Sequence, residues 1–144
     1  MKPKDYSTIS PYLIVNQAED VLDFIKKVFG ATELRRYTNP DGSLMHIELR
    51  IEDSVIMLGE AGQQWPAFPS MLHVYVDNVE AVYRQALAAG AQPVQEPQQQ
   101  EGDPDKRGSF KDPSGNIWWV ASEVGYLNSP IRANNHGAPN SPRS

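Results

Sequence analysis

An internal repeat constrains the fold more than any other feature of this sequence. The same order of predicted elements occurs twice, about 60 residues apart: a short β-rich run, an amphipathic helix that ends at a Gly-Ala pair, and then alternating strands and turns. Gly30-Ala31 ends the first predicted helix, and Gly90-Ala91 ends the second. Because each copy is small for an independent folding unit, the two copies are expected to share a core.

The first copy predicts the order βαβββ. Residues 8–15 form the first expected strand, and a helix follows up to Phe29, with Asn16 as its N-cap and Glu19 as the capping-box partner. The remaining strands are expected over residues 33–37, 44–51 and 55–58, with turns at 39–42 and 52–54.

The second copy predicts the same order. A strand over residues 71–76 leads to a helix capped by Asp77 or Asn78, and Pro93-Val94 begins the next strand. Residues 95–106 are rich in Gln, Pro, Glu and Asp, which predicts a long solvated loop. The last two strands are expected over residues 107–111 and 117–121, joined by a turn at 112–116.

These patterns define one expected domain over residues 1–127. Its parts are module one at 8–60, a linker at 61–69 and module two at 70–124. The remaining residues, 128–144, are rich in Pro, Asn and Ser, and this composition predicts a disordered tail in which His136 is solvated.

Composition excludes several classes of function. The chain has no cysteine, which excludes disulfides, thiolate metal sites and a cysteine nucleophile. The net charge of −5 provides no basic face for nucleic acid. No apolar run approaches the ~18 residues that span a bilayer, and the first residues do not form a signal peptide. We therefore expect a cytoplasmic protein without nucleic-acid or membrane partners.

Four short motifs occur in an order and spacing that resemble a known superfamily. They are Pro11-Tyr12-Leu13, Val28-Phe29-Gly30-Ala31, Val76-Asp77-Asn78-Val79 and Lys111-Asp112-Pro113-Ser114-Gly115-Asn116-Ile117-Trp118. Over residues 8–124 the chain resembles the vicinal oxygen chelate superfamily of glyoxalase I, extradiol dioxygenases and bleomycin-resistance proteins, and most of all its small PhnB-like or glyoxalase-like members. The resemblance implies an α+β fold, in which tandem βαβββ modules form a cupped eight-stranded mixed sheet with helices outside and a ligand cavity on the concave side.

The resemblance also identifies where a metal would be held in metal-dependent relatives. The four corresponding positions are Ser10, Met57, Met71 and Trp119. A thioether is a soft, weak ligand and an indole cannot coordinate a divalent ion, so these residues do not form a ligand set. We expect neither a metal nor another cofactor.

Strand alternation predicts the residues that face the concave side, because neighbouring side chains in a strand point to opposite faces. Aromatic rings and thioethers suit a flat, partly aromatic ligand. The expected ligand pocket consists of Ser10, Tyr12, Met57, Met71, His73, Tyr75 and Trp119. For Met57 a place in the core is an equal alternative.

Three residues are candidates for acid/base chemistry: His46, His73 and Glu48. Together they could form an unconventional His-His-Glu site, although the repeat places the two histidines on different kinds of strand. Each histidine could instead be a hydrogen-bonded pocket or surface residue. The alternation of His46, Glu48 and Arg50 is also typical of a solvated strand face.

Two hypotheses of function follow. The first is a metal-free protein that binds an aromatic or hydrophobic small molecule, with sequestration of that compound as one role for it. The alternative is a lyase or isomerase of the glyoxalase superfamily that acts on a small metabolite through a non-standard site. In both, exposed sheet edges and a partly apolar concave face predict a homodimer.

Overall fold

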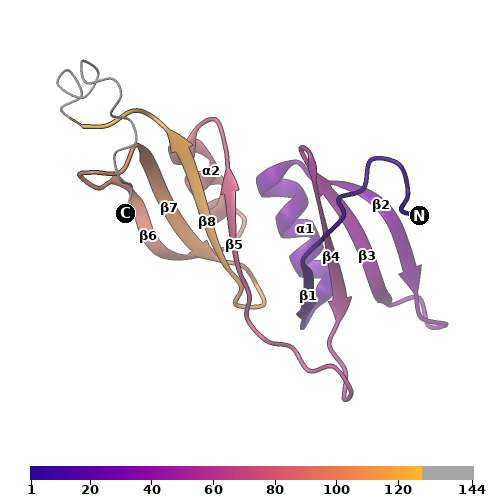
Figure 1. The fold of residues 1–144 in the computed structure, drawn as a ribbon. Coiled ribbons are helices and arrows are strands. Elements are labelled where there is room, and N and C mark those ends of the chain that lie inside the picture. The colour runs from indigo at the N-terminus through magenta and orange to yellow at the C-terminus, as the bar shows by residue number, and fades with distance from the viewer. Residues whose placement is uncertain (128–144) are drawn as a thin grey trace.

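The computed structural model describes residues 1–127 and contains the predicted βαβββ order twice (Figure 1). The expected tail at 128–144, with His136, lies outside the described residues. Module one consists of β1 (Tyr12–Val15), α1 (Ala18–Phe29), β2 (Thr32–Thr38), β3 (Leu44–Ile51) and β4 (Ser54–Glu60). Module two consists of β5 (Met71–Tyr75), α2 (Val79–Ala88), β6 (Gln92–Gln99), β7 (Asp105–Lys111) and β8 (Ile117–Glu123).

Each module builds its own four-stranded mixed sheet, in the order β1-β4-β3-β2 and β5-β8-β7-β6. The pairs β1/β4 and β5/β8 are parallel, and the other neighbours are antiparallel. The α+β fold class is confirmed, with the eight strands divided between two sheets. Strands β1 and β5 are each the edge of a sheet, so both lie at positions where another strand could approach.

Helix α1 begins in a different way from the one predicted. Its cap is not Asn16: Gln17 precedes the helix with a left-handed backbone (φ 59°) and makes no side-chain cap bond. The carboxylate of Glu60, at the end of β4, instead accepts the backbone N–H groups of Gln17 (3.1 Å) and Ala18 (2.8 Å). A distant anion therefore satisfies the helix N-terminus, which local sequence could not reveal. Of the two caps that the sequence offered for α2, Asp77 and Asn78, it is Asn78 that caps the helix through its side chain.

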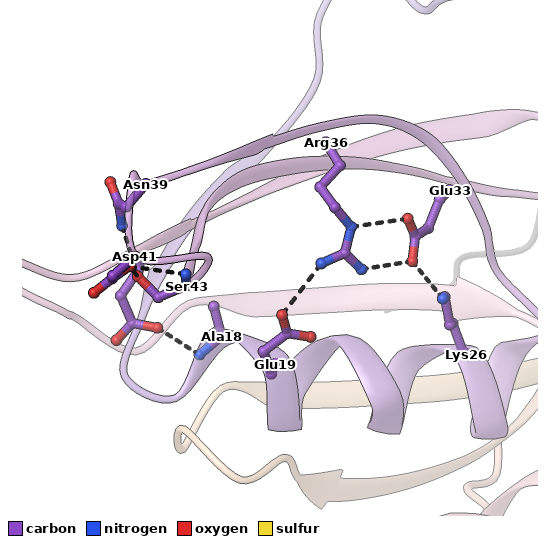
Figure 2. A network of polar contacts seen from close by, with 9 residues as sticks. Ala18, Glu19, Lys26, Glu33, Arg36, Asn39, Asp41 and Ser43 are labelled. Carbon is purple, nitrogen blue, oxygen red and sulfur yellow. Dashed lines mark hydrogen bonds and ion pairs between the residues drawn. The ribbon is translucent and has the colours of Figure 1, made fainter.

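Charged side chains connect β2 to α1 (Figure 2). Arg36 donates to Glu33 (2.8 Å) and to Glu19 (3.2 Å), and Lys26 also donates to Glu33. The hydrogen bonds from Arg36 and Lys26 lower the pKa of Glu33 from 4.5 to about 2. These contacts fix the outer strand against the helix, although partly exposed ion pairs of this kind contribute little individually.

The predicted loop over residues 95–106 is wrong. Strand β6 runs on to Gln99 and β7 starts at Asp105, so the connection is short. Strand β6 pairs only with β7, and an edge strand tolerates proline at positions such as Pro93 and Pro97. Because the strand lies at the sheet edge with mostly exposed or half-buried side chains, its composition resembles that of a loop.

One hydrophobic core serves both modules, as the small size of each copy led us to expect. Phe24 and Phe29 of α1 contact Phe110 of β7, with ring centroids 6.0 and 6.4 Å apart, and Phe29 lies 4.9 Å from Trp118 of β8. Helix α1 is therefore enclosed between its own sheet and module two (Figure 1). None of the helices in the described residues is long and apolar enough to cross a membrane.

The turn between β7 and β8 is held by the buried carboxylate of Asp112. It accepts the backbone N–H groups of Ser114 (2.9 Å) and Asn116 (3.0 Å), the side-chain amide of Asn116 (2.9 Å) and the indole N–H of Trp118 (2.9 Å). Asn116 in turn accepts the backbone N–H of Ser70, at the start of module two. This motif is therefore explained by structure: it fixes the last hairpin to the first strand of the module.

Candidate ligand-binding site

Six of the seven expected pocket residues lie on strands, on the open face of each sheet, which we define as the face opposite its helix. The seventh, Ser10, lies before β1. On module one the register aligns Tyr12 of β1, Met57 of β4 and Glu48 of β3. On module two it aligns His73 of β5 with Trp119 of β8. The intervening residues, such as Leu13 and Trp118, are fully buried in the core. The predicted alternation is thus reproduced on both sheets.

A hydrogen-bonded chain crosses the open face of module one. The hydroxyl of Tyr12 lies 2.8 Å from Nδ1 of His46, and Nε2 of His46 lies 2.9 Å from a carboxylate oxygen of Glu48. The other oxygen of Glu48 accepts the hydroxyl of Tyr6 at 2.6 Å. Arg35 lies 3.9 Å from the same oxygen and 5.3 Å from the centroid of the Tyr6 ring.

The residues before β1 explain the burial of this hydrogen-bonded chain of side chains. Tyr6 covers Glu48, and Arg50 donates to the backbone carbonyl of Asp5 at 2.7 Å. Glu48 is only 6% exposed as a result. The interpretation of His46, Glu48 and Arg50 as a solvated strand face is therefore wrong for Glu48, because residues before β1 fold back over the sheet.

The carboxylate of Glu48 is the electrostatic centre of the chain. Burial alone raises its pKa, but the hydrogen bonds from Tyr6 and His46 and the charge of Arg35 outweigh burial, so the pKa lies below its usual value. Burial and the nearby carboxylate raise the pKa of the Tyr12 hydroxyl. At neutral pH this hydrogen-bonded chain thus contains an ionised Glu48 and a protonated Tyr12.

Gly59 makes the contact between Tyr12 and His46 possible. It lies on β4, beside His46 in the register and between the strands that carry the two side chains. A Cβ atom at this position would lie 2.7 Å from the Tyr12 hydroxyl oxygen and 2.9 Å from its ring. The missing side chain leaves the space through which the tyrosine crosses β4.

Module two carries a separate polar network. Arg107 of β7 lies 2.5 Å from Nε2 of His73, 3.0 Å from Asp103 and 3.1 Å from Asp105. The hydroxyl of Tyr75 donates to the buried carboxylate of Asp105 at 2.7 Å. Burial and the charge of Arg107 lower the pKa of His73 below 6.5. A guanidinium can only donate, so His73 accepts through Nε2 and remains neutral.

The two histidines therefore belong to different clusters. His46 contacts Glu48 directly, whereas His73 is held by Arg107 on the other sheet. The three acid/base candidates do not meet in a single His-His-Glu site. Tyr6 and Asp105 are further members of these clusters that sequence reasoning missed, because neither lay in a recognisable motif.

A cavity of about 660 Å³ lies between the two modules. Four of the expected pocket residues line it: Tyr12, Met71, His73 and Tyr75. Ser10, Met57 and Trp119 are not among its lining residues. The walls also contain aliphatic side chains from both modules, among them Leu13, Ile51, Ile56, Leu72 and Val74. Met71 (66% exposed) and Tyr75 (61% exposed) are accessible at its surface.

The positions that would hold a metal in related proteins do not fit one. Met57 and Trp119 lie within the aligned rows of the open faces, but neither side chain is a ligand for a hard divalent ion. Across residues 1–127 the structure brings together no group of three or more His, Asp or Glu side chains that could hold a metal. The side chains at these positions are therefore not a ligand set for a hard divalent ion.

The fold and the sequence together identify the family. Residues 8–120 match the model of the Glyoxalase/Bleomycin resistance protein/Dioxygenase superfamily, and the chain belongs to it. Uncharacterized proteins of Mycobacterium bovis and Mycobacterium tuberculosis are 34% identical over 131 residues, covering 83% of this chain and 86% and 76% of their own lengths.

Solved structures confirm the fold. TioX from a Micromonospora species matches with a TM-score of 0.69 and 21% identity, covering 81% of this chain and 98% of TioX. The fosfomycin resistance protein FosX of Listeria monocytogenes matches with a TM-score of 0.67 and 16% identity, covering 85% of this chain and 95% of FosX. The PhnB protein of Bacillus cereus matches with a TM-score of 0.65 and 15% identity, covering 81% of this chain and 99% of the PhnB protein.

Proposed function

We propose that this protein binds a small aromatic or hydrophobic compound without a metal, and that it sequesters this compound in the cytoplasm. The observation that carries the proposal is the cavity of about 660 Å³ lined by Tyr12, Met71, His73 and Tyr75. Its volume lies within the range of small-molecule sites, and rings with an adaptable thioether are suited to a flat ligand. Sequestration of a compound is one role open to a chain whose family description names bleomycin resistance proteins.

Calorimetry with para-nitroanisole, a flat neutral probe, tests this proposal. We expect binding that survives dialysis against EDTA and weakens about tenfold in Tyr75→Ala, since that substitution removes one wall of the cavity. Val94→Ala, at an exposed position on the edge strand β6, is the control and should not change the affinity. Loss of binding after chelation, or full affinity in Tyr75→Ala, would contradict the proposal.

A homodimer is part of the same proposal. The open faces expose Tyr12, Tyr37, Met71 and Tyr75. The edge strands β1 and β5 each pair with a neighbouring strand on one side only. A second copy that covers these faces would remove apolar surface from water and close the cavity. Sedimentation at micromolar concentration should give a mass near twice 16.1 kDa. A monomer under these conditions would refute the dimer without affecting the evidence for the cavity.

A second candidate function is a lyase or isomerase that acts on a small metabolite. The observation that favours it is the contact of His46 with Glu48 at 2.9 Å, next to Tyr12, a residue that is 44% exposed. A histidine oriented by a carboxylate is a common arrangement for proton transfer. Comparing the turnover of candidate metabolites by the wild type and by His46→Gln tests this function, and equal turnover would exclude His46 from it.

A further inference from the structure

We propose that Tyr12, His46 and Glu48 form a proton relay that takes the proton of a bound phenol or enol, so that the protein captures such compounds as their anions. This inference rests on the proposed small-molecule-binding function and names the class of ligand. It concerns one ligand chemistry: a flat molecule with a weakly acidic hydroxyl group on its π system.

Hydrogen-bond geometry fixes the direction of the relay. Glu48 is ionised and accepts from the Tyr6 hydroxyl at one oxygen and from His46 at the other. Because a carboxylate only accepts, Nε2 of His46 must carry a hydrogen. In the neutral imidazole, Nδ1 is then an acceptor, so the Tyr12 hydroxyl donates to it across 2.8 Å. The hydroxyl hydrogen of Tyr12 is thus directed at a base.

Only the first residue of the relay is open to a ligand. Tyr12 is 44% exposed and lines the cavity, whereas the side chains of His46 and Glu48 are 17% and 8% exposed. Tyr12 would therefore touch the ligand, and His46 and Glu48 act as positioning residues behind it. The ring of Tyr37, 5.5 Å from His46, adds an exposed aromatic surface beside the relay.

The transfer balances without any further reactant. The ligand's hydroxyl proton moves to the Tyr12 oxygen as the original Tyr12 proton moves to Nδ1 of His46. The O–H bond of the ligand breaks, a new O–H bond forms on Tyr12, and the ligand keeps the electron pair as an anion. The products are a phenolate or enolate that accepts a hydrogen bond from Tyr12, and an imidazolium paired with Glu48. The carboxylate thus stabilises the charge that forms on the histidine.

Module two provides an internal comparison. The register places His73, Arg107 and Ser109 at the positions that correspond to Tyr12, His46 and Glu48. Arginine cannot accept a proton, so these residues do not form a second relay. Ala121 corresponds to Gly59. The relay and the glycine that makes room for it therefore occur together in module one.

Imidazole nitrogen NMR tests the direction of the relay without a ligand. In the wild type we expect His46 to be the Nε2–H tautomer at neutral pH, with Nδ1 accepting a hydrogen bond. Tyr12→Phe and Gly59→Ala should both shift the Nδ1 resonance, the second by displacing the tyrosine ring while keeping all three functional groups. Tyr83→Phe removes a hydroxyl from α2 and is the matched control. An Nδ1–H tautomer, or a resonance unchanged in Tyr12→Phe, would overturn the relay.

Absorbance with para-nitrophenol tests the proton transfer itself, with para-nitroanisole as the matched probe that lacks the acidic proton. Mixed with the wild type at about pH 6, para-nitrophenol should show more phenolate absorbance than the same probe in buffer, and this excess is the phenolate band that reports the transfer. It should also bind about tenfold more tightly than para-nitroanisole, as expected for a charge-assisted hydrogen bond. Tyr12→Phe, Gly59→Ala and Glu48→Gln should each abolish the band.

The outcomes separate this inference from the proposed function. If para-nitroanisole binds and the phenolate band is absent, the relay is refuted and the binding proposal stands. If para-nitroanisole does not bind, the aromatic cavity proposed above is refuted, and absence of the phenolate band refutes the relay as well. A phenolate band that persists in Tyr12→Phe would also overturn the relay, because another group would then accept the proton.

Discussion

Removing the carboxylate of Asp112 should be among the most damaging single changes in this protein. Asp112→Ala leaves three hydrogen-bond donors without their partner inside the core: the backbone and side-chain amides of Asn116 and the indole N–H of Trp118. Both of these residues are fully buried. A buried donor without a partner costs about 1–3 kcal/mol, and some water will reach the gap, so we expect a loss of about 4 kcal/mol. Such a loss is a large part of a typical stability of about 5–15 kcal/mol.

Urea unfolding followed by tryptophan fluorescence measures this loss. Asp112→Asn keeps the shape but replaces one accepting oxygen by a donor, so it should lose about half as much, ~2 kcal/mol. Asp53→Ala, at an exposed turn between β3 and β4, should change stability by less than about 0.5 kcal/mol. A loss below ~1 kcal/mol in Asp112→Ala would refute the reasoning, since buried donors would then have found other partners.

Three further predictions concern pH and metal. Because the pKa of His73 in the folded protein is lowered from 6.5, the unfolded state binds the proton more readily than the folded state. The contribution of His73 to stability is therefore complete above pH 6.5 and is lost as the pH falls below that value. Urea midpoints should fall over this window in the wild type and fall less in His73→Gln. The Glu33 carboxyl should titrate near 2 by NMR, because hydrogen bonds from Arg36 and Lys26 lower its pKa, and its pKa should lie nearer 4.5 in Arg36→Ala. The stability that this group contributes is complete above 4.5 and is lost as pH falls towards 2. Elemental analysis should find no stoichiometric divalent ion in the wild type, and Ser10→Ala should leave that result unchanged.

The sequence predicted the elements whose periodicity is set by the core. The βαβββ order, a cap of α2 at Asp77 or Asn78 and the alternation that buries Leu13 and Trp118 all follow from local patterns. Two predictions failed because tertiary contacts decided the outcome. Glu60 caps α1 from another strand, and β6 pairs at a sheet edge where polar residues and proline are tolerated.

The candidate site was predictable only in part for a similar reason. Alternation correctly placed Tyr12 and His73 on the open faces of the sheets. The contact of Tyr12 with His46, however, needs the gap at Gly59. The sequence shows a glycine within a strand but not which side chain will occupy the space beside it. The burial of Glu48 depends on Tyr6, which lies before the first strand and carried no pattern that would place it over a sheet.

The enclosed position of α1 has a consequence for the integrity of the chain. Phe24 and Phe29 pack against Phe110 and Trp118, so the contact between modules is made by core side chains and not by the connecting peptide alone. A protease that cut within residues 61–69 would therefore leave two fragments that still bury each other's aromatic rings. They should remain associated as a noncovalent pair, and separately expressed halves should reconstitute the fold when mixed.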